Sequence, residues 1–365
     1  MKNSLSTAVV QAMADSLLAV YPDFKREQFV ALASDGLASL ELKQRVQHII
    51  NALVQNLPQD FAHSGKLLTA LPDYWDALPE AERMSGFAVW PLIDYVAVAG
   101  LEQPQLAYTV LAALTPRFSA EFAIRPFIER YPEQSWQQLL VWSQAEDEHL
   151  RRLASEGCRP RLPWGKQLKD LIADPRPILP ILDALKDDTS LYVRRSVANN
   201  LNDISKDHPE WVLDVCQAWL ENATKQRHWL IKHATRSLIK QGHPRSFTLL
   251  GYTAEPALVV EEFALLEPQV KQGQALTFGF ALRATQPQQN WVVDYAVHFM
   301  KANGQKAAKV FKLKNIALRK DECFAMEKSH SFKPISTRNY YAGEHSVALH
   351  VNGQEVARRT FYLED

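Results

Sequence analysis

The hydrophobic periodicity of this 365-residue chain changes once, near residue 254, and this change constrains the fold more than any other feature. Up to about residue 250 the sequence is a succession of helix-length periodic segments separated by short turn signals. From about residue 254 apolar and polar residues alternate with period two, in segments rich in Val, Phe and Tyr. The sequence therefore predicts an all-helical domain over residues 1–252 and an all-β domain over residues 254–365.

Several helical segments carry a proline near their start, where the missing N–H is not needed. Pro132, Pro175, Pro209 and Pro244 recur at intervals of about 35 to 43 residues, a period typical of paired-helix repeats of the HEAT type. An irregular all-α domain is the alternative. Because several segments also share a charged turn followed by a Trp or Leu stripe, we expect an α-solenoid of HEAT-like helical repeats.

The C-terminal part contains about seven segments that fit β-strands. Asn-Gly pairs at residues 303–304 and 352–353 lie between strands, where they favour tight hairpin turns. Trp291 opens a central strand, and Tyr341 precedes Gly343 in the manner of a tyrosine corner. We expect an all-β immunoglobulin-like sandwich.

Composition limits the classes of protein to which the chain can belong. Its three cysteines are widely spaced and form no CxxC pair, which argues against a disulfide framework or a thiolate zinc site and fits a reducing cytoplasm. No segment offers the roughly 18 uninterrupted apolar residues of a membrane span. We therefore expect a soluble, cytoplasmic protein with no membrane partner.

Charge is unevenly distributed along a chain whose formal net charge is zero. Residues 148–253 carry 17 Lys and Arg against 12 Asp and Glu, whereas residues 1–147 carry 10 against 17. Such a distribution can leave a positive face on a neutral molecule, although it does not identify the partner.

The segment 192–205 predicts a helix with two stripes of different character. Its apolar stripe consists of Val193, Val197, Leu201 and Ile204. Arg195, Asn199 and Asp203 repeat every four residues and form a second, polar stripe. Taken alone, this spacing favours a solvated surface over a site.

Two other segments gather unusual polar residues. Glu121 and Arg125 lie four positions apart, which fits either a simple ion pair or a carboxylate that the arginine holds in place. Trp164 lies between Pro163 and Gly165 at a helix boundary, which leaves a core anchor and a site residue equally open.

Motifs for several common chemistries are absent. The sequence has no phosphate-binding GxxxxGK[ST], no GxGxxG, no GxSxG elbow and no HExxH helix. His228 and His233 lie five positions apart, on different sides of a helix, which favours a structural or phosphate-facing pair over metal ligands. We expect neither a metal nor a cofactor.

Several motifs together carry a family resemblance. AEFAIRPFI, SEGCRPRLPW, VRRSVANNLNDISKDHP, HWLIKHATRSLIKQGHP and LLGY resemble motifs of the AlkC branch of the AlkC/AlkD family of DNA glycosylases. The match covers residues 1 to about 252, and the C-terminal part resembles the immunoglobulin-like domain of a subset of AlkC proteins. The resemblance implies a solenoid whose concave basic surface binds duplex DNA, and a monofunctional glycosylase that excises N3-methylated purines, chiefly 3-methyladenine.

The resemblance also implies roles for individual residues. Asp203 and Glu121 are the expected active-site acids, Trp164 is expected to lie against the lesion, and Arg152 and Glu156 are expected to support the site. The residues expected to bind DNA are Arg159, Arg161, Arg194, Arg195, Asn199, Lys225, Arg227, His228, Lys232, His233 and Arg236. The expected partner is double-stranded DNA containing alkylated bases, and the protein is expected to act as a monomer. A non-enzymatic HEAT-repeat scaffold that binds DNA or protein is the alternative.

Overall fold

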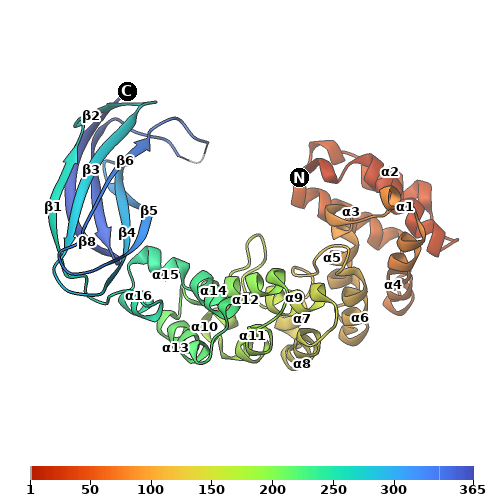
Figure 1. The fold of residues 1–365 in the computed structure, drawn as a ribbon. Helices are drawn as coiled ribbons and strands as arrows, with labels where there is room; N and C mark the ends of the chain where they lie inside the picture. The colour runs from red at the N-terminus through yellow and green to blue at the C-terminus, as the bar shows by residue number, and fades with distance from the viewer. Residues whose placement is uncertain (1, 337) are drawn as a thin grey trace. The chain divides into compact units, whose positions relative to one another are not determined.

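The structure, a computed structural model, describes residues 2–336 and 338–365 (Figure 1). In the described residues, sixteen α-helices precede eight β-strands, in the order that the change of periodicity predicts. Two compact units form in space. The first comprises the chain up to His208 together with Ala223–Ala234, and the second comprises Pro209–Asn222 and Thr235–Asp365.

The first unit is entirely helical in its described part. Its α-helices are α1 (Thr7–Val20), α2 (Arg26–Ser34), α3 (Leu42–Asn56), α4 (Phe61–Ala77), α5 (Trp90–Ala99), α6 (Pro104–Leu114), α7 (Arg125–Arg130), α8 (Pro132–Ser143), α9 (Glu148–Gly157), α10 (Lys169–Ala173), α11 (Leu179–Leu185), α12 (Leu191–Ile204) and α14 (Lys225–Ala234). Its short 3-10 helices are η1 (Lys2–Ser4), η2 (Leu37–Ser39), η3 (Glu80–Glu82), η4 (Gly86–Ala88) and η5 (Arg176–Ile178).

These helices stack on their neighbours in two rows. In one row α3 packs against α5, α9 against α12, and α12 against α14; in the other α4 packs against α6, and α8 against α11. Each helix pair thus contacts mainly the next pair along the chain, as in helical-repeat proteins. This arrangement confirms the predicted α-solenoid of HEAT-like repeats.

Local sequence signals explain where several helices begin. Pro132 is the first residue of α8, as Pro209 and Pro244 are of α13 (Pro209–Leu220) and α16 (Pro244–Leu249), because a first-turn residue needs no N–H donor. The Asp147 carboxylate caps α9 by accepting a hydrogen bond from the His149 N–H at 2.6 Å.

Helix α12 confirms the apolar stripe but only part of the solvated one. All four residues of the apolar stripe are buried. Arg195 is exposed and Asn199 half-buried, but Asp203 is only 2% exposed. The expectation of a solvated polar stripe is therefore wrong at Asp203, because α9 and the segment after it cover that turn of the helix.

The second unit combines three helices with a two-sheet β-sandwich. The helices are α13, α15 (Arg236–Gln241) and α16. The strands are β1 (Leu258–Leu265), β2 (Gln269–Lys271), β3 (Ala275–Ala284), β4 (Gln289–Met300), β5 (Lys306–Leu318), β6 (Cys323–Ser331), β7 (Gly343–Val351) and β8 (Gln354–Glu364). Six of them match the predicted segments, and β1 overlaps the segment predicted at 263–268 only at residues 263–265. Strand β2 has three residues, too few to show a period of two.

One sheet has the strand order β1-β3-β6 and the other β2-β8-β7-β4-β5. All pairings are antiparallel except that of β2 with β8. Both sheets contribute to one apolar core that includes Trp291, Phe278 and Val347, as a sandwich requires. This confirms the predicted all-β sandwich.

The turns of the sandwich are only partly as expected. Asn352 and Gly353 both have positive φ, at 48° and 78°, which fits a type I′ hairpin turn between β7 and β8. The expected tyrosine corner is wrong, since the Tyr341 side chain is exposed.

The helical and β elements separate between the end of α16 at Leu249 and the start of β1 at Leu258. The compact units divide elsewhere, because α13, α15 and α16 group with the sheets. A domain boundary at residues 252–254 therefore stays a prediction. Among the described residues, no helix combines the length and the apolar character needed to cross a membrane.

Candidate active site

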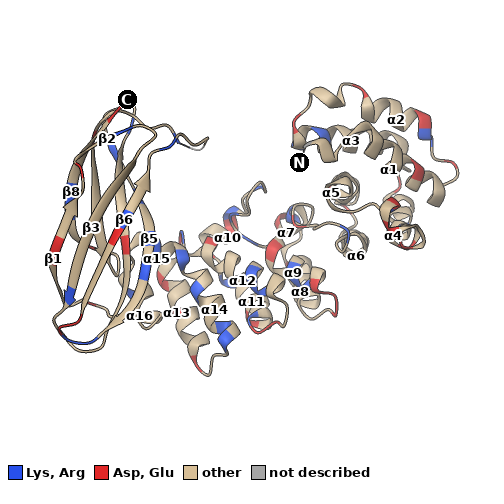
Figure 2. Ribbon diagram, turned by 45° about the horizontal axis from the view of Figure 1, so that its top comes forward, with Lys and Arg blue, Asp and Glu red and all other residues tan. Residues whose placement is uncertain are grey.

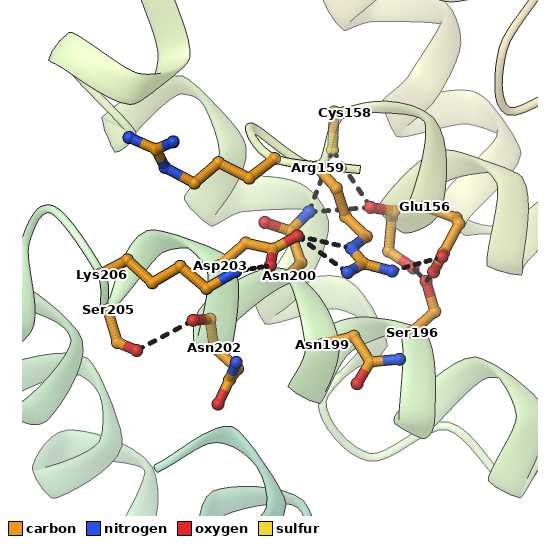
Figure 3. Close-up of polar contacts among 12 residues, drawn as sticks. Glu156, Cys158, Arg159, Ser196, Asn199, Asn200, Asn202, Asp203, Ser205 and Lys206 are labelled. Atoms are coloured by element: carbon orange, nitrogen blue, oxygen red, sulfur yellow. Dashed lines mark hydrogen bonds and ion pairs between the residues drawn. The ribbon is translucent and has the colours of Figure 1, made fainter. Parts of the chain in front are cut away.

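The candidate site is a row of alternating acidic and basic side chains between α9, α12 and the turn that precedes α7. We call it the charge row. Its members, in order, are Glu121, Arg152, Glu156, Arg159, Asp203 and Lys206. Figure 3 shows its second half, with Arg159 lying between Glu156 and Asp203. Four of these six residues were expected to be catalytic or supporting site residues, and the structure brings all four together.

Asp203, on the last turn of α12, is the most deeply buried acid of the row. Its Oδ2 accepts a hydrogen bond from Arg159 Nε at 2.8 Å and lies 2.8 Å from Arg159 Nη2 in an ion pair. Its Oδ1 lies 2.9 Å from Lys206 Nζ. An unpaired charge at this depth would be strongly destabilising, so the two cations are needed to hold the carboxylate there.

Glu156, on α9, links the two arginines. Its Oε1 lies 2.6 Å from Arg159 Nη1 and 3.5 Å from Arg152 Nη2. Its Oε2 accepts a hydrogen bond from Ser196 Oγ at 2.6 Å, and Ser155 Oγ donates to Ser196 Oγ at 2.6 Å. Both carboxylate oxygens are thus occupied, which suits a residue that fixes its neighbours.

Glu121 lies in the turn before α7 and pairs with Arg152, not with Arg125. The predicted i,i+4 pair is wrong because Arg125 turns into the protein interior. Arg152 Nη1 lies 2.8 Å from Glu121 Oε2 in an ion pair without hydrogen-bond geometry. Arg152 also donates to Ser119 Oγ at 2.8 Å, and its guanidinium lies over the Tyr192 ring, 4.9 Å from the centroid.

The acids of the charge row offset the effect of burial on the pKa values of its two arginines. Burial by itself lowers the pKa of Arg152, but the charges of Glu156 and Glu121 outweigh it and raise that pKa overall. Burial likewise lowers the pKa of Arg159, and Glu156 and Asp203 raise it above its ordinary value. Both guanidinium groups therefore remain charged.

Trp164 is presented to solvent in an unusual backbone conformation. Its side chain is 54% exposed, which excludes a core anchor. The Gly165 N–H donates to the Leu162 carbonyl at 3.1 Å, and Trp164 has a φ of 65°. With Pro163 at the first central position, these features fit a type II turn, whose second central position normally takes Gly or Asn. A large aromatic residue in this position is strained, and such strain concentrates at functional sites.

Three comparisons with known proteins bear on this geometry. Residues 118–238 match the family described as DNA alkylation repair enzyme, and residues 259–365 match the family described as Uncharacterised protein YhaZ, C-terminal Ig-like domain. The chain is 36% identical over 355 residues to the uncharacterized protein YhaZ of Bacillus subtilis strain 168, covering 97% of this chain and 96% of YhaZ. It is 39% identical to the alkylpurine DNA glycosylase AlkC of Pseudomonas fluorescens in a structure bound to DNA containing an abasic site analog. That match has a TM-score of 0.91 and covers 100% of this chain and 99% of AlkC.

The chain belongs to the AlkC branch of the AlkC/AlkD family of DNA glycosylases. The resemblance in the motifs is thereby confirmed, together with an immunoglobulin-like C-terminal domain. At the level of the family, the chain is a DNA glycosylase of alkylation repair. The segment matched to the DNA alkylation repair family, residues 118–238, contains the whole charge row and Trp164.

Three arginines expected to bind DNA in this AlkC-branch chain already have protein partners. Arg159 is buried between two carboxylates, a geometry that suits positioning these acids, and its expected contact with DNA stays a prediction. Arg161 pairs with Asp207 at 2.7 and 2.8 Å, near the surface. Arg194 donates to the backbone carbonyls of Asp188 and Thr189 at 2.5 and 2.9 Å.

Arg195 and helix α14 present the more accessible basic groups. Arg195 is exposed on α12, and Lys225, His228 and Lys232 are exposed on α14. Figure 2 shows Lys and Arg positions along α14.

The remaining expected DNA-binding residues are less exposed. Arg227 Nε donates to Asp187 Oδ1 at 2.7 Å. His233 Nε2 lies 3.2 Å from Asn199 Oδ1. Arg236 opens α15, in the second unit. The expected DNA-binding residues therefore do not form one uniform set, and their contacts with DNA stay a prediction.

Asp94, on α5, is a buried acid that no motif in the sequence predicts. Its Oδ2 accepts a hydrogen bond from Trp90 Nε1 at 2.7 Å, while its Oδ1 is buried without a partner. Burial raises the pKa of Asp94 to about 7; the Trp90 hydrogen bond and the charge of Lys43 oppose this, and the charge of Glu121 adds to it. No sequence signal marks this acid, because it lies on a helix of ordinary apolar character.

Proposed function

We propose that this chain hydrolyses the N-glycosidic bond of cationic alkylated bases in double-stranded DNA, chiefly 3-methyladenine. In this proposal it acts as a monomer, without a metal or cofactor. The observation that carries the proposal is the charge row, which holds two candidate catalytic carboxylates in one network; the exposed, strained Trp164 follows Arg159 of this row in the sequence. Membership of the AlkC branch supports the choice of substrate class.

The chemistry of the substrate explains why carboxylates suffice. A 3-methylated adenine is already cationic, so its departure needs no proton from a general acid. As the base leaves, positive charge develops on C1′ and the ring oxygen of the sugar, as in glycoside hydrolysis. A carboxylate held close to this charge stabilises it and orients the attacking water.

Asp203 and Glu121 differ in how they would become available to the sugar. Lys206, which pairs with Asp203 Oδ1, has a side chain that is 43% exposed. It can therefore swing towards a phosphate and release that oxygen. In the described part of the chain no hydrogen bond engages Glu121 Oε1, which leaves this oxygen for substrate or water.

Trp164 supplies selection by charge. The face of a tryptophan attracts a cation by about 0.5 to 2 kcal/mol, so it favours a methylated, cationic base over a neutral one. The exposure of the ring is what this role requires.

Basic groups outside the charge row would bind the DNA backbone. Arg195, Lys225 and Lys232 are exposed and suited to phosphate contacts, which carry no sequence information. Binding of this kind is salt-dependent and tolerates any sequence, as a repair enzyme requires.

The β-sandwich also has a feature suited to phosphate. A hollow of about 310 Å³ is lined by Lys309, Lys328, Lys333 and Arg338, and no acidic residue lines it among the described residues. From the sequence alone, the cluster of Lys306, Lys309, Lys312 and Lys314 favours a solvated sheet face over a role in holding DNA. The grouping of four cations favours a second contact with the DNA backbone.

The alternative of a non-enzymatic scaffold makes a different prediction for methylated plasmid DNA. If the chain is a glycosylase, incubation creates abasic sites, which appear as strand breaks after alkali treatment. A scaffold retards the plasmid in a gel but creates no more alkali-labile sites than are found in methylated plasmid incubated without the protein. That result would reject the proposed function.

A further inference from the structure

We infer that Arg125 is a positioning residue for Trp164: it fastens both ends of the segment that carries the tryptophan. The inference rests on the proposed function, since it assigns Arg125 a part in presenting Trp164 to the lesion. We call residues 158–166 the tryptophan segment.

Arg125 is 1% exposed, at the first position of α7. Its Nη1 donates to the backbone carbonyls of Gly157 and Arg159, both at 2.9 Å. Its Nε donates to the carbonyl of Lys166 at 2.7 Å, and its Nη2 contacts the same carbonyl. One guanidinium therefore holds the start and the end of the tryptophan segment together.

Two side chains of the tryptophan segment, Arg159 and Arg161, bind acids, but the backbone of the segment has few other fixed points. The Leu168 N–H donates to the Pro160 carbonyl at 3.1 Å, and the turn at Leu162 is closed by its own hydrogen bond. Lys43 Nζ contacts the Trp164 carbonyl, but both residues are exposed. Arg125 is thus the buried side chain that binds the backbone of this segment near both of its ends.

The choice of partners argues against a simple ion-pair role for Arg125. Burial lowers its pKa to about 10, and no ion pair of this residue is found in the described part of the chain. Its N–H groups donate to backbone carbonyls instead, and a planar guanidinium with several donors can bind several carbonyls at once. A lysine has a single ammonium group and cannot reach two separated ends in the same geometry.

The strained conformation of Trp164 explains why such an anchor is needed. A non-glycine residue with positive φ persists only when its surroundings over-determine the backbone. If the ends of the segment come loose, the turn relaxes and the indole ring moves. A displacement of about 1 Å at a site of this kind can reduce the rate about 100-fold.

The test uses Arg125→Lys and a matched control, Arg45→Lys. Arg45, on α3, is also buried, and its guanidinium also donates to three backbone carbonyls, those of Leu40, Leu5 and Ala38, each at 2.9 Å. Both variants should lower the melting temperature by similar amounts. Only R125K should slow single-turnover excision of 3-methyladenine, by about tenfold or more, while R45K stays within about twofold of wild type.

A double-mutant cycle with Trp164→Ala separates positioning from general destabilisation. If Arg125 acts through Trp164, R125K should cost less than about threefold in the W164A background, because the two effects are coupled. Equal costs in both backgrounds would overturn the inference. A wild-type protein that releases no 3-methyladenine would reject the proposed function, whereas an active wild type with an equally active R125K rejects only the role of Arg125.

If R125K does not fold, the amide hydrogen exchange rates of the wild-type protein test whether Arg125 holds the tryptophan segment. The amide hydrogens of Gly165 and Leu168 should exchange as slowly as those of α7, because the hydrogen bonds of Arg125 join this part of the chain to that helix. Exchange as fast as in exposed loops would overturn the inference.

Discussion

Replacement of Asp203 by asparagine should separate catalysis from DNA binding. A unit charge about 4 Å from the developing positive charge contributes about 4 kcal/mol at an effective dielectric constant of about 20. Arg159 and Lys206 offset part of this, which leaves about 3 kcal/mol of transition-state stabilisation and predicts a rate about 100-fold lower in D203N.

This substitution should reduce the stability of the folded protein less than it reduces the rate of excision. An asparagine keeps one oxygen for the two Arg159 donors and turns its NH2 group towards Lys206, whose exposed side chain can move into water. We expect a loss of about 1 to 3 kcal/mol in the free energy of unfolding. Affinity for duplex DNA containing an abasic-site analogue should stay close to that of wild type.

Asp188→Asn provides the matched control. Asp188 is also a buried carboxylate paired with an arginine, with its Oδ2 2.6 Å from Arg151 Nε, but it lies outside the charge row. D188N should lose comparable stability and keep excision within about threefold of wild type. The assay is single-turnover release of 3-methyladenine at a temperature where all variants are folded. Normal excision by a folded D203N, or equal losses in both variants, would refute the reasoning.

Three further predictions concern other parts of the site. Trp164→Gly should remove the positive-φ strain, so the free energy of unfolding should be unchanged or up to about 1 kcal/mol higher in denaturant titrations, while excision falls; a clear loss of stability would contradict the turn assignment. In urea titrations, the free energy of unfolding of Asp94→Asn should rise relative to that of wild type by about 1 kcal/mol or more between about pH 4 and about pH 7. The reason is that the pKa of Asp94 is raised in the folded protein, so the wild type loses the stability contributed by the protonated carboxyl as the pH rises. A constant difference would show that Asp94 does not titrate in this range. Arg195→Ala should weaken binding to all DNA sequences alike and reduce the slope of log K against log salt by about 1, whereas an unchanged slope would exclude a phosphate contact.

Hydrophobic periodicity was sufficient to predict the architecture, because helices and strands are determined largely by residues that are close in the sequence. The buried stripe of α12 and six of the eight strands follow directly from spacings of four and of two. Strand β2 escapes because three residues do not establish a period, and its parallel pairing with β8 depends on residues more than ninety positions away.

The pairing within the site could not be predicted in the same way. Glu121 has Arg125 four positions away, yet it pairs with Arg152, because tertiary packing decides which arginine turns inward. Arg159 was expected to bind DNA, and no local signal shows that it is buried between Glu156 and Asp203. The strained turn at Trp164 did have a signal, since Leu-Pro-Trp-Gly places proline at the first central position and a tryptophan where glycine is usual.

The identity of the base released from methylated duplex DNA tests the central claim most directly. Chromatography of the soluble fraction after incubation should show 3-methyladenine as the chief product, at a rate far above its spontaneous loss. Binding of the same DNA without release of 3-methyladenine above the spontaneous rate would contradict the account.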